Sequence, residues 1–216
     1  TTLFRSAYET HEQIYPEPGW VEHDPTEIWE NTQTVVQRAL DDAAVDAEQL
    51  AALGITNQRE TTLLWDRDSG RPVYNAIVWQ DRRTTDRVET LEDDDRADWI
   101  RDKTGLEPDA YFSATKAEWL LDNADPIKTQ RARPADLRDR AEAGQICFGT
   151  IDSWLIYNLT GEHVTDVTNA SRTMLFDIHE TSWDDELLAE FGVPRASLPE
   201  VRPSSDDAYY GFTDAE

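Results

Sequence analysis

The chain has 216 residues, 38% of them hydrophobic, and its eight tryptophans, seven tyrosines and six phenylalanines exclude a disordered acidic chain, which carries few aromatics. Its 45 Asp and Glu against 20 Lys and Arg give a formal charge of -25, which argues against a nucleic-acid partner because such binding relies on clustered cations. The single Cys147 excludes an intrachain disulfide, and without an 18-residue apolar run or a charged-then-apolar leader we expect a cytoplasmic protein with no membrane span.

The first fifth of the chain predicts one strand and one long helix. Residues 3–8 form a strand-like run with no turn or cap before it, so we expect the chain to begin inside a domain. Asp24 is placed to cap a helix, because Pro25 occupies the first helical position and Glu27 lies three residues beyond the cap.

A sheet with a hairpin is predicted next. Strands are expected at 53–56, 61–65 and 74–79, with a turn at the string DRDSG (66–70) between the last two. These strands would form the first part of a sheet.

Helices and strands alternate through the rest of the chain. We expect helices at 81–92, 96–103 and 113–123, followed by a solvated helix or loop in the charged stretch 125–144. Strands and helices that alternate at these lengths indicate an α/β domain. The remaining expected elements are a strand at 146–148, a helix over 151–159 that ends at Gly161, a strand at 173–178 and a helix at 184–192.

Polar side chains gather where an apolar strand ends, in the string GITNQRETT (54–62). In open α/β sheets ligands lie beyond the carboxyl ends of strands. A polyol hydroxyl both donates and accepts hydrogen bonds, so Arg59 and Glu60 would supply the donor and the carboxylate that such a ligand needs. Trp79 and Tyr111 would complete the pocket. The alternatives are a surface ion pair at 59–60 and two aromatics of the core.

Six segments in the same order resemble the glycerol kinases, and the resemblance runs through nearly the whole chain. It implies an α/β fold of the actin-like, ribonuclease-H-like kinase type, with a mixed sheet and flanking helices. Residues 1–216 would form most of the N-terminal polyol-binding domain, missing its first strand and its C-terminal end. The segments are EQIYPEPGWVEHDP, GITNQRETT, YNAIVWQDRRT, YFSATK, FGTIDSWLI and DVTNASRTMLF.

The resemblance also implies transfer of the terminal phosphoryl group of ATP to glycerol, giving sn-glycerol 3-phosphate, with Mg²⁺ as cofactor. Arg59, Glu60 and Tyr111 match the family's glycerol-contacting positions, and Trp79 matches an aromatic that lines the carbon face of the substrate. No catalytic, cofactor-binding or metal residue is assigned in this chain, which has neither GxGxxG nor GxxxxGK[ST]. The family's catalytic Asp and its ATP-binding second domain would follow Glu216.

Asp152, Asp166 and Asp184 are therefore interpreted as a helix-start residue, a loop residue and a second helix-start residue, and not as catalytic bases. Two alternatives stay open: a stand-alone polyol-binding module without catalysis, and a glycoside hydrolase that uses two of the many carboxylates. The sequence leaves the oligomeric state open, a homo-oligomer included.

The acidity is spread along the whole chain, and its lysines are Lys103, Lys116 and Lys128. Self-repulsion of this size destabilises a compact fold in dilute buffer, and concentrated salt screens it. The composition therefore predicts adaptation to a salt-filled cytoplasm, with an ordinary acidic protein as the alternative.

Overall fold

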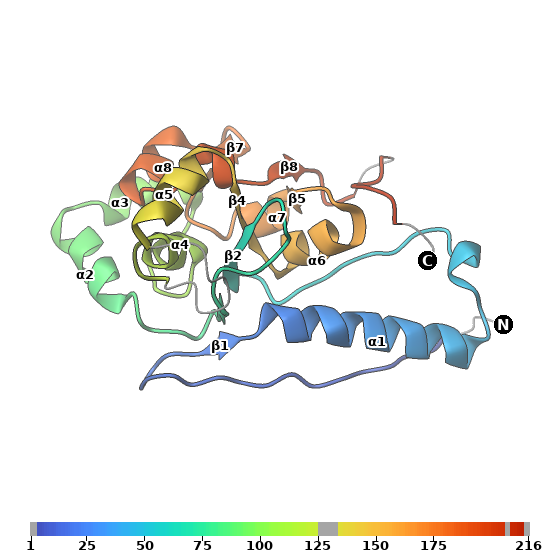
Figure 1. The fold of residues 1–216 in the computed structure, drawn as a ribbon. Coiled ribbons are helices and arrows are strands. Elements are labelled where there is room, and N and C mark those ends of the chain that lie inside the picture. Colours follow the sequence, from blue (N-terminus) through green and yellow to red (C-terminus); the bar gives the residue numbers. More distant parts are fainter. Residues whose placement is uncertain (1–3, 125–133, 206–207, 214–216) are drawn as a thin grey trace.

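A computed structural model describes residues 4–124, 134–205 and 208–213 (Figure 1). At its centre is an antiparallel four-stranded sheet in the order β1-β3-β2-β4. The longest pairing joins β2 and β4, whose register runs from Thr62 opposite Thr150 to Asp66 opposite Ile146. The strands are β1 (Glu22–His23), β2 (Thr62–Asp66), β3 (Ala76–Ile77) and β4 (Ile146–Thr150).

Two smaller strand pairs lie beside this sheet. β5 (Val164–Asp166) runs parallel to β8 (Glu200–Arg202), and β6 (Phe176–Asp177) runs antiparallel to β7 (Ser182–Trp183). The described strands therefore pair in both directions, within the α/β class that the sequence predicts.

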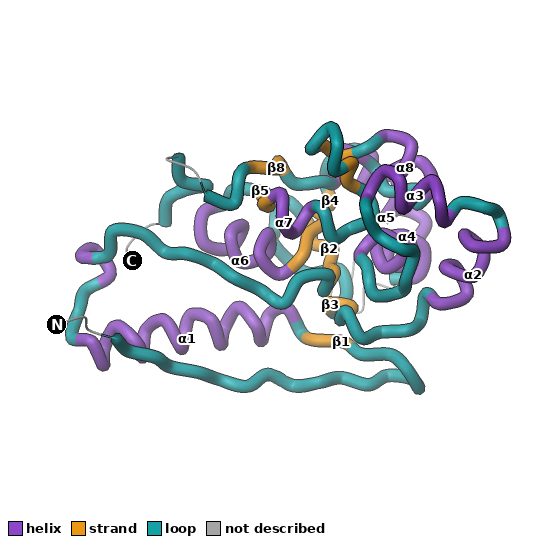
Figure 2. Tube along the Cα trace, turned by 180° about the vertical axis from the view of Figure 1, so that it is seen from behind, coloured by secondary structure: helices purple, strands orange, loops and turns teal. Residues whose placement is uncertain are grey.

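Helices cover both faces of the central sheet. In both views α4 and α5 lie on one side of β2 and β4 while α6 lies on the other (Figures 1 and 2). None of the described helices is long and apolar enough to cross a membrane. The helices are α1 (Pro25–Ala43), α2 (Thr85–Asp93), α3 (Ala97–Thr104), α4 (Ser113–Asn123), α5 (Pro134–Glu142), α6 (Ile151–Thr160), α7 (Val167–Ala170) and α8 (Asp185–Glu190), with 3₁₀ turns at Ala47–Gln49 and Arg195–Ser197.

The alternation of side chains along β2 and β4 divides the core into two layers. Leu64 and Phe148 point into the larger layer, which contains the buried faces of α4, α5 and α8. Leu63, Trp65 and Cys147 point the other way, into a smaller layer shared with α6. The sheet is thus buried on both faces, and the central residues of β2 are apolar, as are the first three of β4.

Several helix boundaries follow the local signals in the sequence. The Asp24 carboxylate accepts a hydrogen bond of 2.9 Å from the amide of Thr26, and Pro25 is the first residue of α1, as predicted. α4 spans the predicted 113–123, and α6 ends at Gly161, whose φ of 76° is the left-handed conformation that glycine adopts readily.

Two predicted strands are absent from the described part of the chain. Residues 4–8 and 53–56 have no strand partner there, and side chains such as Phe4 and Leu53 are 79% and 48% exposed. A strand needs a neighbour for its amides and carbonyls, and an apolar run alone does not supply one. Residue 3, the start of the first predicted strand, lies outside the described residues.

Two other predictions are corrected in length or character. The strand expected at 173–178 is reduced to β6, because Met174 has a φ of 61°, which interrupts an extended backbone. In the charged stretch 125–144, residues 125–133 lie outside the described part and α5 follows. α5 is not merely solvated, because Leu137 and Ala141 are buried.

α1 lies apart from the rest of the fold. It is flanked by the extended residues 4–20 and by the segment 45–58 (Figures 1 and 2). Its first turn is attached through Trp154, whose indole N–H donates to the carbonyl of Pro25 at 3.0 Å. Further along, α1 holds the N-terminal segment, for example through the Arg38–Glu9 ion pair at 2.6 Å.

We expect folding to depend on salt, because the formal charge of -25 repels itself most strongly in dilute buffer. At about 1 M salt the Debye length falls to about 3 Å and screens this repulsion. The melting temperature measured by circular dichroism should therefore be lower in dilute buffer than in multimolar KCl. Equal melting temperatures in the two buffers would contradict the predicted adaptation to salt.

Candidate functional site

Glu60 lies in the turn that leads into β2 and adopts an unusual backbone conformation. Its φ is 67°, a left-handed value that costs a non-glycine residue about 1–3 kcal/mol. Its carbonyl accepts hydrogen bonds from the hydroxyls of Thr62 at 2.9 Å and Ser113 at 3.4 Å, which hold the turn in place. A strained residue that its surroundings fix in this way is often part of a functional site.

Arg172 is the partner of the Glu60 carboxylate. The guanidinium Nε donates to Oε1 of Glu60 at 2.6 Å, from a side chain that is one-third exposed to a carboxylate that is 5% exposed. The same guanidinium lies over the ring of Phe112 at 5.0 Å and that of Tyr111 at 5.7 Å, within cation–π range. Arg172 follows α7, so the site joins segments that are far apart in the chain.

Tyr111 and Trp79 form the aromatic side of the site. Their ring centroids are 5.4 Å apart with the planes tilted, and both side chains are half-buried. Tyr111 is fixed at its backbone, because its amide donates to the carboxylate of Asp109 at 2.7 Å. Three of the four predicted site residues, Glu60, Tyr111 and Trp79, are thus linked through Arg172 and direct ring contact.

Arg59 stands apart from this group. Its side chain is exposed, and the structure describes no contact between it and the other three predicted residues. The Glu60 carboxylate pairs with Arg172, so the ion pair at 59–60 that the sequence left open is not formed. Arg172 was missed as a site residue because its partner is 112 residues away, although it lies in one of the six resembling segments.

A buried charge cluster anchors the segment that carries Trp79. The guanidinium of Arg83 donates to Glu22 at 2.7 Å and to Asp81 at 2.8 Å, and these side chains are at most 2% exposed. It lies over the rings of Trp20 and Trp119, at 3.8 and 4.5 Å from their centroids. Bonding to the two carboxylates raises the pKa of Arg83 despite its burial.

A second buried carboxylate holds the loop before Glu60. The Asp152 carboxylate accepts hydrogen bonds from the side-chain amide of Asn57 at 3.1 Å and from the hydroxyl of Thr165 at 2.7 Å. It also accepts one from the hydroxyl of Thr150. Burial raises its pKa. Asp152 lies in the first turn of α6, as predicted, and its carboxylate is committed to structural hydrogen bonds; the N-cap residue of α6 is Thr150.

The other two aspartates set aside by sequence cap helices. Asp184 accepts from the amide of Leu187 at 2.8 Å at the start of α8, as predicted. Asp166, predicted as a loop residue, caps the short α7 by accepting from the amide of Asn169 at 2.7 Å.

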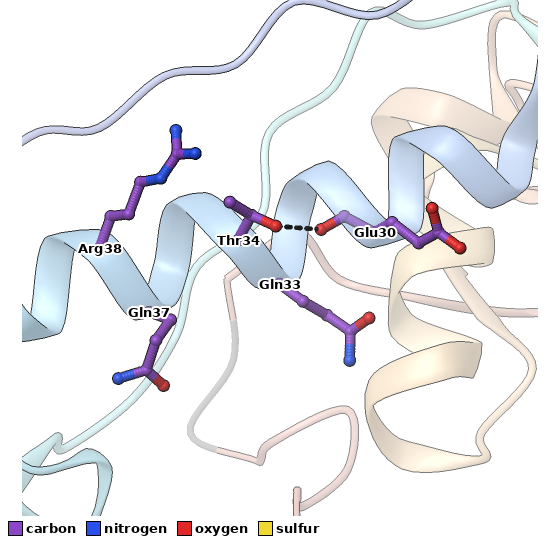
Figure 3. Close-up of a pocket in the computed structure, with 5 residues that line it drawn as sticks. All are labelled: Glu30, Gln33, Thr34, Gln37 and Arg38. Atoms are coloured by element: carbon purple, nitrogen blue, oxygen red, sulfur yellow. Dashed lines mark hydrogen bonds between the residues drawn. The ribbon is translucent and has the colours of Figure 1, made fainter.

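A hollow of about 570 Å³ lies elsewhere, on α1. Its polar side chains point away from the helix, and within it the Thr34 hydroxyl donates to the carbonyl of Glu30 at 2.9 Å (Figure 3). None of the four predicted site residues lines this hollow, so it is a surface separate from the candidate site. Among the residues that the structure describes, no three His, Cys, Asp or Glu side chains are grouped to hold a metal ion. The hollow is lined by Glu30, Gln33, Thr34, Gln37 and Arg38.

Comparison with known proteins matches residues 1–213 to the FGGY family of carbohydrate kinases, N-terminal domain. The chain is 74% identical over 211 residues to a glycerol kinase of Haloferax volcanii, covering 98% of this chain and 41% of that protein. It is 53% identical over 203 residues to glycerol kinase 2 of Thermotoga maritima, covering 93% of this chain and 38% of that protein. The chain thus spans about two-fifths of the length of these relatives.

Solved structures share the fold. A Plasmodium falciparum glycerol kinase with ADP matches with a TM-score of 0.84 and 35% identity, over 95% of this chain and 39% of that one. A gluconate kinase from Lactobacillus acidophilus matches with a TM-score of 0.76 and 23% identity, over 90% of this chain and 36% of that one, which shows likeness of fold alone. The predicted α/β fold of the actin-like, ribonuclease-H-like type is confirmed.

Proposed function

Because this chain belongs to the FGGY family of carbohydrate kinases, we propose that residues 1–216 form most of the polyol-binding N-terminal domain of a glycerol kinase. In the whole protein the reaction transfers the γ-phosphoryl group of ATP to glycerol and yields sn-glycerol 3-phosphate. The observation that carries the proposal is the convergence of Glu60, Arg172, Tyr111 and Trp79 at the turn that leads into β2. Relatives with the name glycerol kinase support the choice of substrate.

The chemistry of the cluster suits a small polyol. One oxygen of the Glu60 carboxylate binds Arg172, and the other is left to accept a hydrogen bond from a hydroxyl group of glycerol. The tyrosine hydroxyl of Tyr111 can donate or accept, and Arg59 adds an exposed donor next to Glu60 in the chain. The rings of Trp79 and Tyr111 cover the carbon face of the ligand.

The proposal gives this chain the binding and orientation of glycerol, and no step of phosphoryl transfer is assigned to its residues. ATP and Mg²⁺ would supply the phosphoryl group and neutralise its charge. This chain spans about two-fifths of the length of its relatives, and ATP and Mg²⁺ are proposed to bind mainly through the remaining length of the longer protein. Relatives from halophilic archaea support a salt-rich cytoplasm as the location.

We expect the full-length protein that carries this chain to form ADP in the presence of ATP, Mg²⁺ and glycerol, and the isolated 216-residue chain to show background turnover. Coupled ADP assays on both proteins test this, and isothermal titration of the isolated chain with glycerol tests for binding without catalysis. ADP formation by the isolated chain would contradict the division of roles. A full-length protein that phosphorylates other polyols and not glycerol would overturn the proposed substrate.

A further inference from the structure

Lys116 is a fully buried lysine beside the proposed site, and the proposed function gives it no role. It lies in the first turn of α4, is 0% exposed, and its Nζ donates to the carbonyls of Tyr111 and Phe112, the latter at 3.2 Å. These carbonyls belong to the two residues just before α4, and Tyr111 carries one of the site's rings.

We propose that Lys116 is a positioning residue of the polyol site, which helps to fix the ring of Tyr111 by holding the backbone that follows it. The inference rests on the proposed function. Three restraints meet at Tyr111: Asp109 accepts from its amide, Lys116 donates to its carbonyl, and its ring lies between Trp79 and the Arg172 guanidinium. With both backbone groups fixed, the hydroxyl is presented to a ligand in one orientation.

Fold stability alone does not account for a lysine at this position. Lysine side chains near a surface extend their amines into water, and burial of an ammonium group is costly. A cation in the first turn of a helix is also disfavoured by the helix dipole. Methionine would fill a similar volume at neither cost but has no donor for these two carbonyls, so the hydrogen bonds of Lys116 account for the lysine here.

The charges around Lys116 make this restraint depend on pH. The carboxylates of Asp81, Glu60 and Asp109 favour its charged form and Arg82 opposes it, while burial is the largest effect and lowers its pKa to about 7. Below that pH the ammonium forms charge-assisted hydrogen bonds with the two carbonyls, and above it the neutral amine forms weaker ones. The restraint therefore weakens as pH rises through about 7.

Fold stability changes in the opposite direction. The pKa of Lys116 is lower in the folded chain than its ordinary value of 10.5, so between about 7 and 10.5 the unfolded chain binds more protons. Its contribution to the free energy of unfolding therefore rises with pH in that window. A residue with a purely structural role would change stability and leave the use of glycerol unaltered.

The test compares Lys116→Met and Lys116→Gln with wild type in the full-length protein, from pH 6 to pH 9. The control is Lys103→Met, which removes a lysine of α3 that pairs with Asp184 and Glu186 at the start of α8. At pH 6.5 we expect Lys116→Met to lower kcat/KM for glycerol about tenfold, the scale of a lost charge-assisted hydrogen bond, with KM for ATP unchanged. Lys116→Gln retains an N–H donor, so its kcat/KM for glycerol should lie between those of wild type and Lys116→Met.

The pH profile separates positioning from stability. KM for glycerol should rise through about pH 7 in wild type and in Lys103→Met, and stay flat in both Lys116 variants. Circular dichroism melts at pH 7 check that both Lys116 variants are folded, because Lys116→Met removes a buried charge and also the donor to two carbonyls. An unaltered glycerol KM in Lys116→Met, or equal changes in the KM values for glycerol and ATP, would overturn the role of Lys116 and leave the proposed function standing. A wild-type protein without glycerol-dependent turnover would overturn the proposed function as well.

Discussion

Arg83→Met is expected to lower the free energy of unfolding by about 3–5 kcal/mol, the cost of leaving buried charges without their partner. The side chain of Arg83 is fully buried, and its removal would leave the buried carboxylates of Glu22 and Asp81 without their cationic partner. It would also remove the cation–π contacts of the guanidinium with Trp20 and Trp119. Urea titration followed by tryptophan fluorescence, in salt high enough to keep the wild type folded, measures the change.

The neighbouring residue provides a matched control. Arg82 pairs with Asp109 at 2.7 Å, but these side chains are 53% and 44% exposed, and such surface pairs contribute about 0–1 kcal/mol. Arg82→Met should therefore cost at most about 1 kcal/mol, although it deletes the same side chain one position away. If the two variants lost the same stability, the buried cluster at Arg83 would have no special role in the fold.

Glu60→Ala is expected to lower kcat/KM for glycerol about 10- to 150-fold in the full-length protein, the range for losing a charge-assisted hydrogen bond. The carboxylate is the one acidic group among Glu60, Arg172, Tyr111 and Trp79. Its loss also frees the Arg172 guanidinium that it holds at 2.6 Å. KM for ATP should barely change, because the effect is confined to the polyol side. Steady-state kinetics with each substrate varied in turn gives the result.

Matched variants make this outcome specific. Glu89→Ala removes an exposed glutamate of α2 and should leave the kinetics unaltered. Arg59→Ala should fall in the same range as Glu60→Ala, with Arg71→Ala, another exposed arginine before β3, as its control. Tyr111→Phe should cost less, since it deletes one neutral hydrogen bond and keeps the ring. Wild-type use of glycerol by both Arg59→Ala and Glu60→Ala would refute the site assignment.

Local signals in the sequence predicted the helices well. α4 was expected at 113–123 and found there, and α1 and α6 begin or end at the predicted cap and glycine. The failures are strands, because a strand is defined by a partner that can lie anywhere in the chain. The apolar run at 53–56 has none among the described residues, whereas the three-residue strands β5 and β8 were missed and exist because they pair with each other.

The candidate site shows the same division. Glu60, Tyr111 and Trp79 were selected from single segments, and the structure brings them together. Their contact with glycerol stays a prediction. The donor for the carboxylate was not identified, because proximity in sequence favoured Arg59 while the fold supplies Arg172. Lys116 was counted as one of three lysines, and no local pattern marks a lysine as buried.

The distance along the chain between Glu60 and Arg172 also affects the order of folding. These residues are 112 positions apart, and β2 and β4, which lie between them in the chain, pair across separations of 80 to 88 residues. Contacts of this range require closure of large loops and form slowly compared with helices. During synthesis the ribosome must release residue 172 before the carboxylate finds its partner, so the two halves of the polyol site stay separate until most of the domain has emerged.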